Sequence, residues 1–170
     1  RNNLIYKKLI LTKAGKMKYI FIEFEGYKYW IEVDDEGGAL RQIIKDEENR
    51  ISVSCLEPCL ADQYVDTENN CVKIKKIEFE DIWEKAVLPY REIWNEEKQK
   101  YLKGEKITGT IKYFYPHGAI LALDSMLGCA DIDDCNGKPL YPGYKISGIV
   151  SGFDEENMWI LISDCELCIN

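Results

Sequence analysis

Histidine is nearly absent from this chain, because His117 is the only one among its 170 residues. Histidine is the side chain that most often transfers protons or binds metals near neutral pH. The sequence also lacks the Gly-x-Ser-x-Gly elbow of serine hydrolases and the Gly-Lys-Ser/Thr loop that cradles phosphates. With no catalytic template present, we expect a protein that is not an enzyme.

Long apolar runs are missing as well. The longest, such as residues 119–123 and 19–22, contain only a few residues, and no segment approaches the length of a membrane span. Residues 1–16 have neither a long apolar core nor a small-residue cleavage site, so they do not resemble a secretion signal. We therefore expect a cytoplasmic protein that has no membrane partner.

Cysteine is plentiful but irregularly spaced. The seven cysteines are Cys55, Cys59, Cys71, Cys129, Cys135, Cys165 and Cys168. An odd number without a secretion signal favours reduced thiols in a cytosol. The pairs 55/59 and 165/168 are close enough to suggest zinc, but a zinc site needs four converging nitrogen or sulfur ligands. Because the spacing is irregular and only one histidine is available, we expect no metal and no other cofactor.

Basic charge is scarce and unevenly placed. The net charge is −8, and residues 104–170 hold four Lys and Arg against ten Asp and Glu. This balance argues against a surface built for non-specific phosphate binding. Residues 1–16 hold five basic residues and no acid. We expect them to be a leader or an appended extension before a domain that begins near Met17; a basic arm that contacts nucleic acid is the alternative.

The first half of the chain shows the two-residue period of strands. Alternation and turn residues predict an antiparallel β domain over residues 17–80. Its strands are expected at 18–24, 27–33, 39–45 and 50–56, with a further one within 71–79.

A helical period then predicts a connecting helix over residues 81–103. Asp81 is a suitable N-cap, and Pro89 is expected to kink the helix because proline cannot donate a backbone hydrogen bond. The residues at helical spacing are Ile82, Ala86, Ile93 and Tyr101. The tryptophans Trp83 and Trp94 are expected to pack on the protein's own sheet, with a partner protein as the alternative.

Strand periodicity returns after Gly104, with glycines and apolar residues in an ordered set. The set comprises Gly104, Ile107, Gly109 and Ile111, then Pro116, Gly118 and Ala119, then Leu121 and Leu123, then Gly128 and Ile132, then Pro142 and Gly143, and finally a turn at 154–157. In this order residues 104–163 resemble the S1-type RNA-binding domain, a five-stranded barrel of the OB class.

The resemblance implies a C-terminal OB-fold barrel over residues 104–170, with RNA or another single strand as the expected ligand. The whole fold is then mainly β (α+β), with a small antiparallel meander, a kinked helix and the barrel. Five antiparallel strands are expected to close around Ile107, Ile111, Phe114, Leu121, Leu123, Ile132, Ile146, Val150, Ile160 and Ile162.

The family's binding face is altered in this sequence. His117 stands where the family has an aromatic residue before the glycine corner, and Ile120 where a second one follows. Asp131 stands in place of a histidine, Ile149 in place of a basic residue, and Trp159 in place of an arginine. Only His117 and Trp159 can still stack on a base, and none of the five carries a permanent positive charge.

Two functions follow from this altered face. The first is weak or selective binding of RNA or single strands; the second is a protein-interaction or regulatory module on a barrel that has lost RNA binding. The candidate nucleic-acid contacts are Lys112, Tyr113, Tyr115, His117, Ile120, Lys145 and Trp159.

Overall fold

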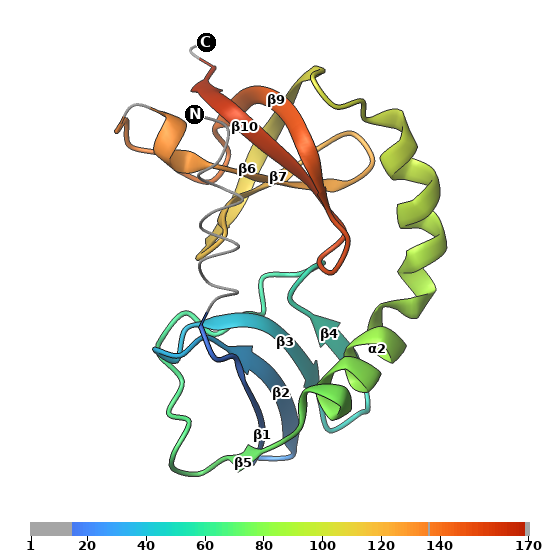
Figure 1. Cartoon of the computed structure of the whole chain (residues 1–170), viewed down its shortest axis with the longest axis vertical. Coiled ribbons are helices and arrows are strands. Elements are labelled where there is room, and N and C mark those ends of the chain that lie inside the picture. The colour runs from blue at the N-terminus through green and yellow to red at the C-terminus, as the bar shows by residue number, and fades with distance from the viewer. Residues whose placement is uncertain (1–14, 136, 169–170) are drawn as a thin grey trace. The chain divides into compact units, whose positions relative to one another are not determined.

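The computed structural model describes residues 15–135 and 137–168 and is drawn in Figure 1. The predicted leader, residues 1–16, lies outside the described residues except for Gly15 and Lys16. The chain forms two compact units, one ending at Pro89 and the other beginning at Tyr90. The predicted fold class is confirmed: an antiparallel sheet, one kinked helix and a closed five-stranded barrel.

The first unit contains a five-stranded antiparallel sheet in the order β4-β3-β2-β1-β5. Its strands are β1 (Lys18–Phe24), β2 (Tyr27–Val33), β3 (Ala39–Lys45), β4 (Ile51–Val53) and β5 (Val72–Lys73). The first three coincide with the predicted ranges, whereas β4 and β5 are shorter. The prediction of a strand reaching residue 79 was wrong, because the helix already begins at Lys76.

The two faces of this sheet pack against different parts of the first unit. On one face, Ile20, Ile31 and Val33 are buried with Ala39, and the irregular segment after β4 packs against them. This segment contributes Leu60, Ala61, Val65 and Cys71. The other face carries Tyr19, Glu32 and Arg41, which lie opposite one another across β1, β2 and β3.

Arg41 connects this second face to the start of the helix. Its side chain is buried, with Nε 2.6 Å from Glu32 Oε2 and Nη2 2.7 Å from Glu80 Oε1. The guanidinium also lies 4.9 Å from the ring centroid of Phe79 and 5.0 Å from that of Trp83. Such a planar cation can bind two carboxylates and stack on rings at the same time. Arg41 therefore fixes the first half of the helix on the sheet.

The helix α2 spans Lys76–Glu97 and is followed by the 3₁₀ turn η1 (Lys98–Lys100). It begins before the predicted cap Asp81, because Glu78 Oε2 accepts a hydrogen bond from the Lys75 backbone N–H at 2.6 Å. Pro89 lies inside it, as predicted. Trp83 and Trp94 are both buried, which confirms that they pack on the protein itself, whereas the predicted apolar position Ile93 is exposed.

The second unit is the barrel, with the strand order β10-β8-β7-β6-β9. The strands are β6 (Lys106–Tyr115), β7 (Gly118–Ala122), β8 (Leu127–Ala130), β9 (Lys145–Asp154) and β10 (Trp159–Leu167), and the turn η2 (Ile132–Cys135) follows β8. One pair corrects the prediction of five antiparallel strands, because β10 runs parallel to β8. This pairing lets the last strand close the barrel between β8 and β9.

The barrel core contains most of the predicted residues. Six of the ten are buried, namely Ile111, Leu121, Ile146, Val150, Ile160 and Ile162, while Ile107, Leu123 and Ile132 are half-buried. The prediction for Phe114 was wrong, because its side chain is 39% exposed. Phe114 pairs with the buried Ala119 near the end of β6, so it lies on the inward side of the strand but at the rim of the barrel.

Among the described helices, none combines the length and the apolar character that crossing a lipid bilayer would require.

Candidate nucleic-acid interface

Four aromatic side chains form a continuous cluster on the barrel. Tyr113 and Tyr115 come from the end of β6, His117 from the β6–β7 turn and Trp159 from the start of β10. The ring centroids of Tyr113 and Tyr115 are 4.9 Å apart, and those of His117 and Trp159 are 5.3 Å apart. Tyr115 joins the two pairs, at 6.3 Å from His117 and 6.1 Å from Trp159.

A β-bulge brings the two tyrosines to one face of β6. Ile111 pairs with Leu121 and Tyr113 pairs with Ile120, so that Lys112 is an extra residue without its own partner on β7. Bulges of this kind change the direction of the side chains that follow them. Because Tyr113 and Tyr115 are two residues apart after the bulge, their rings lie on the same side of the strand.

The turn that carries His117 depends on Gly118. This residue has φ +141°, and a Cβ atom there would lie 2.3 Å from the carbonyl oxygen of Ala130. Only glycine fits at such a close approach. The β6–β7 turn is therefore held against β8, and the position of His117 beside Trp159 follows from that constraint.

The predicted contact residues differ in exposure. Tyr113, Tyr115 and His117 are half-buried, whereas Trp159 is 1% exposed and Ile120 is 0% exposed. The rings of Tyr115 and His117 lie against Trp159. Trp159 and Ile120 thus belong to the packed base of the cluster, and the other three rings are less buried.

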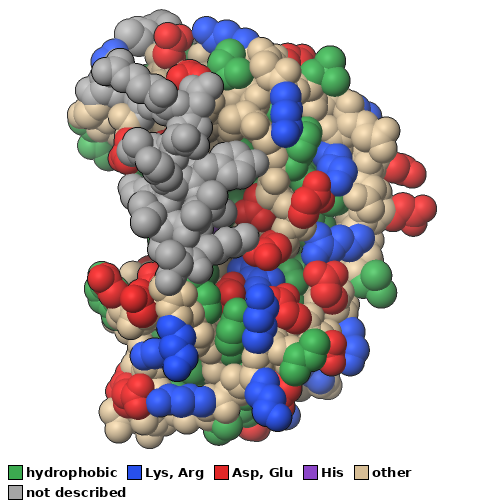
Figure 2. Space-filling model, viewed as in Figure 1, with side chains coloured by type: hydrophobic (Ala, Val, Ile, Leu, Met, Phe, Trp, Pro, Cys, Tyr) green, Lys and Arg blue, Asp and Glu red, His purple; other side chains and the backbone are tan. Residues whose placement is uncertain are grey.

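The two candidate lysines lie on the barrel surface. Lys112 occupies the bulge, and Lys145 begins β9 opposite Thr110 of β6. Both are exposed, and neither forms an ion pair with any described residue. On the described part of the face drawn in Figure 2, basic and acidic side chains are interspersed, without one large field of either sign.

The remaining altered positions of the binding face have structural contacts. The carboxylate of Asp131 accepts a hydrogen bond from the Asp133 backbone N–H at 3.0 Å, at the start of η2. Ile149 is half-buried and lies opposite Lys106 in the β6–β9 pair. Neither side chain supplies a basic contact for phosphate.

The thiols do not form a metal site among the described residues, where no three His, Cys, Asp or Glu side chains converge. None of the seven cysteines is in a disulfide bond, and Cys129 Sγ donates a hydrogen bond of 3.5 Å to the carbonyl oxygen of His117. Burial, together with Asp154 and Asp131, raises the pKa of the Cys129 thiol far above its usual range. Burial also raises the pKa of Cys59 to about 12. Both remain protonated at neutral pH, a form that binds metal poorly.

The sequence prediction missed three exposed rings elsewhere on the barrel, those of Phe114, Tyr141 and Tyr144. The signal for the tyrosines was present, because Pro142 and Gly143 between them indicate a tight turn that presents its flanking residues to solvent.

No family model and no curated protein matches this chain.

Proposed function

We propose that this protein binds RNA or another single-stranded nucleic acid through its barrel, weakly or with selectivity for certain bases. The observation that carries the proposal is the continuous cluster of Tyr113, Tyr115, His117 and Trp159. Stacking of one base on an aromatic side chain contributes about 1–3 kcal/mol. A cluster with three half-buried rings at the edge of a barrel therefore offers a stacking surface for one or two bases.

The charge distribution defines how such a strand is held. A protein that neutralises few phosphates releases few counterions, so its affinity falls only shallowly as salt rises. The barrel has few cations, and of the candidate lysines only Lys112 is next to a ring of the cluster in the chain. Stacking then supplies most of the affinity, and tight binding to any nucleic acid is not expected.

The role that we assign is binding rather than catalysis, without a metal or an organic cofactor. The lack of disulfide bonds among the described cysteines fits a reducing cytoplasm, which is the location that we propose.

The proposal is tested by titrating short fluorescent RNA and DNA oligonucleotides with the protein over a series of salt concentrations. Tyr115→Ala is expected to weaken binding about 5- to 150-fold, because it removes the central ring of the cluster. Tyr90→Ala is the matched control, since Tyr90 is an exposed tyrosine on α2 outside the cluster. Equal losses for the two variants, or a steep salt dependence that Tyr115→Ala leaves unchanged, would contradict the proposal.

A protein-interaction or regulatory role is the second candidate. The burial of Ile120 and Trp159 favours it, because these positions carry contact side chains in the family that the barrel resembles. Absence of binding to any single strand at low salt, in a protein that is fully folded, would support this role.

A further inference from the structure

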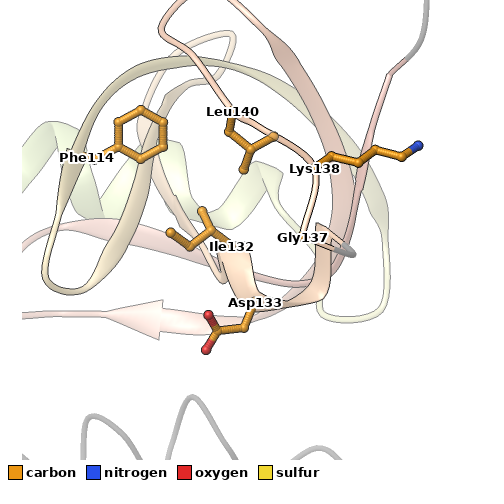
Figure 3. Close-up of a pocket in the computed structure, with 6 residues that line it drawn as sticks. All are labelled: Phe114, Ile132, Asp133, Gly137, Lys138 and Leu140. Atoms are coloured by element: carbon orange, nitrogen blue, oxygen red, sulfur yellow. The ribbon is translucent and has the colours of Figure 1, made fainter.

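A second apolar surface lies at the rim of the barrel, around a pocket of about 440 Å³. Phe114, Ile132 and Leu140 gather as its apolar wall, as Figure 3 shows. Asp133, Gly137 and Lys138 complete the lining. Pockets of roughly 300–1,000 Å³ accommodate small organic ligands. The volume is therefore sufficient for a flat ring placed against Phe114.

This pocket is distinct from the aromatic cluster. Phe114 pairs with Ala119, whereas its neighbours Tyr113 and Tyr115 pair with Ile120 and Gly118. Since successive side chains of a strand point to opposite faces, Phe114 and the two tyrosines are on opposite sides of β6. One strand end thus presents rings in two directions.

Two exposed tyrosines extend the apolar surface beyond the pocket. Tyr141 and Tyr144 are 56% and 42% exposed, and their rings meet edge to face at 5.5 Å. They flank a turn in which Gly143 has φ +92° and the Tyr144 N–H donates to the Tyr141 carbonyl oxygen at 3.1 Å. Backbone hydrogen bonds of 2.8 Å in both directions attach this turn to Ile111 of β6. The turn is therefore held in place, and Leu140 of the pocket immediately precedes it.

One of the few cations of the barrel, Lys138, lies at this pocket. After Lys106 the chain contains nine acidic residues but only three basic ones, Lys112, Lys138 and Lys145. Lys138 lines the pocket, whereas Lys112 and Lys145 are not among its lining residues. All three are exposed and form no ion pair with a described residue.

We propose that this surface binds one nucleotide, with its base against Phe114 and its phosphate near Lys138. Exposed rings and exposed cations are the two groups that bind nucleotides in single strands, by stacking and by phosphate contact. In Figure 3 the two charged side chains of the lining, Asp133 and Lys138, both extend away from the apolar wall, in different directions. The inference extends the proposed function, on which it rests for the class of ligand.

Two-dimensional NMR titration of the isotopically labelled full chain distinguishes this inference from the proposed function. A short RNA is one ligand and uridine monophosphate is the other, which separates a strand from a free nucleotide. We expect RNA to shift the backbone signals of Phe114, Ile132, Leu140 and Tyr144 in addition to those of the aromatic cluster. Shifts confined to the cluster would overturn the inference and leave the proposed function standing. Shifts confined to the pocket would support the inference and contradict binding at the aromatic cluster. An absence of shifts would overturn both.

Variants test the two groups separately. Phe114→Leu keeps an apolar wall but removes the ring, and it is expected to weaken RNA binding about 5- to 150-fold. Lys138→Ala is expected to make binding less sensitive to salt, because one phosphate contact is lost. Lys106→Ala is the matched control, since this exposed lysine begins β6, far along the strand from Phe114, and pairs with Glu166. Binding that is as strong for Phe114→Leu and Lys138→Ala as for the control would overturn the inference.

Discussion

The indole Nε1 of Trp94 donates a hydrogen bond of 2.7 Å to Oε2 of Glu155. Trp94 is buried on α2, and Glu155 lies in the turn between β9 and β10. Lys98 Nζ lies 2.9 Å from the same carboxylate and 5.4 Å from the Trp94 ring centroid, and Arg91 donates to the Glu155 backbone carbonyl. One exposed acid therefore attaches the second half of the helix to the barrel.

This contact makes the stability of the second unit depend on pH. Partial burial raises the pKa of Glu155, but hydrogen bonds from Lys98 and Trp94 outweigh it and hold the pKa below its usual value of 4.5. A carboxyl group whose pKa is lower in the folded state stabilises the folded protein at pH values above its unfolded-state pKa. That stabilisation is lost as the pH falls through the folded-state pKa. We expect Glu155→Gln to cost about 1 kcal/mol or less at neutral pH, since the carboxylate is largely exposed. Urea denaturation at neutral and acidic pH measures this, and a cost that is the same at both would contradict it.

The buried Arg41 gives a larger effect in the first unit. Arg41→Met leaves Glu32 and Glu80 without their cation, and breaking a buried ion pair costs about 3–5 kcal/mol. Arg50→Ala is the control, because Arg50 is 75% exposed in its pair with Asp46, and such pairs contribute about 0–1 kcal/mol. Chemical denaturation that finds similar losses for the two variants would show that Arg41 is not an essential support of the helix.

Trp159 is expected to act on stability more than on binding. Removing a buried tryptophan leaves a cavity, so Trp159→Ala should lower the free energy of unfolding by about 3–5 kcal/mol. Tyr115→Ala, at a half-buried position, should cost less while weakening RNA binding. The comparison uses circular dichroism for stability and fluorescence anisotropy for binding. If Trp159→Ala keeps full stability but loses RNA affinity, the base stacks directly on Trp159.

Gly118 offers a test of the turn that places His117. Gly118→Ala adds a methyl group next to the Ala130 carbonyl in a backbone conformation that alanine disfavours. A strained backbone residue costs about 1–3 kcal/mol. Gly104→Ala separates strain from crowding, because Gly104 has φ +89° but nothing lies within 4 Å of its added Cβ. Thermal unfolding should therefore show the larger loss for Gly118→Ala.

The thiols should react slowly and hold no zinc. Cys55, Cys129, Cys135 and Cys165 are buried, so a thiol reagent should modify them only after unfolding. A reaction time course with and without denaturant measures this. Stoichiometric zinc in protein purified without added metal, detected by elemental analysis, would contradict the expected lack of a metal site.

Local patterns predicted the first sheet well and the helix less well. The strands β1, β2 and β3 alternate regularly between turn residues, and their ends were predicted to the residue. The helix was predicted to begin at Asp81, because the lysines and isoleucines before it also fit a strand. Its start is capped by the hydrogen bond from the Lys75 backbone N–H to Glu78, and Phe79 in its first turn packs on Arg41, 38 positions earlier in the sequence, a contact that no local period reveals.

The sequence predicted which residues form the candidate site but not how exposed each one is. Residues His117 and Trp159 were expected on one face, and their rings do meet. The exposure of Phe114 was missed, because the side chain lies on the inward side of β6 but at the rim of the barrel, and the sequence does not show where the rim lies. The parallel direction of β10 was missed because strand direction follows from the connections between strands and not from their side chains.

The parallel pair of β8 and β10 also affects how the protein is made. Residues 127–130 of β8 pair with residues 159–162 of β10, and β9 pairs with β10 as well. Neither β8 nor β9 can complete its pairing before β10 is present. Until then each has an open edge, and open edges pair readily with other chains. On the ribosome, the barrel can close only after β10 has left the exit tunnel. A chain that stops before Trp159 would keep both edges open, which makes interrupted synthesis the point at which this barrel is most exposed to aggregation.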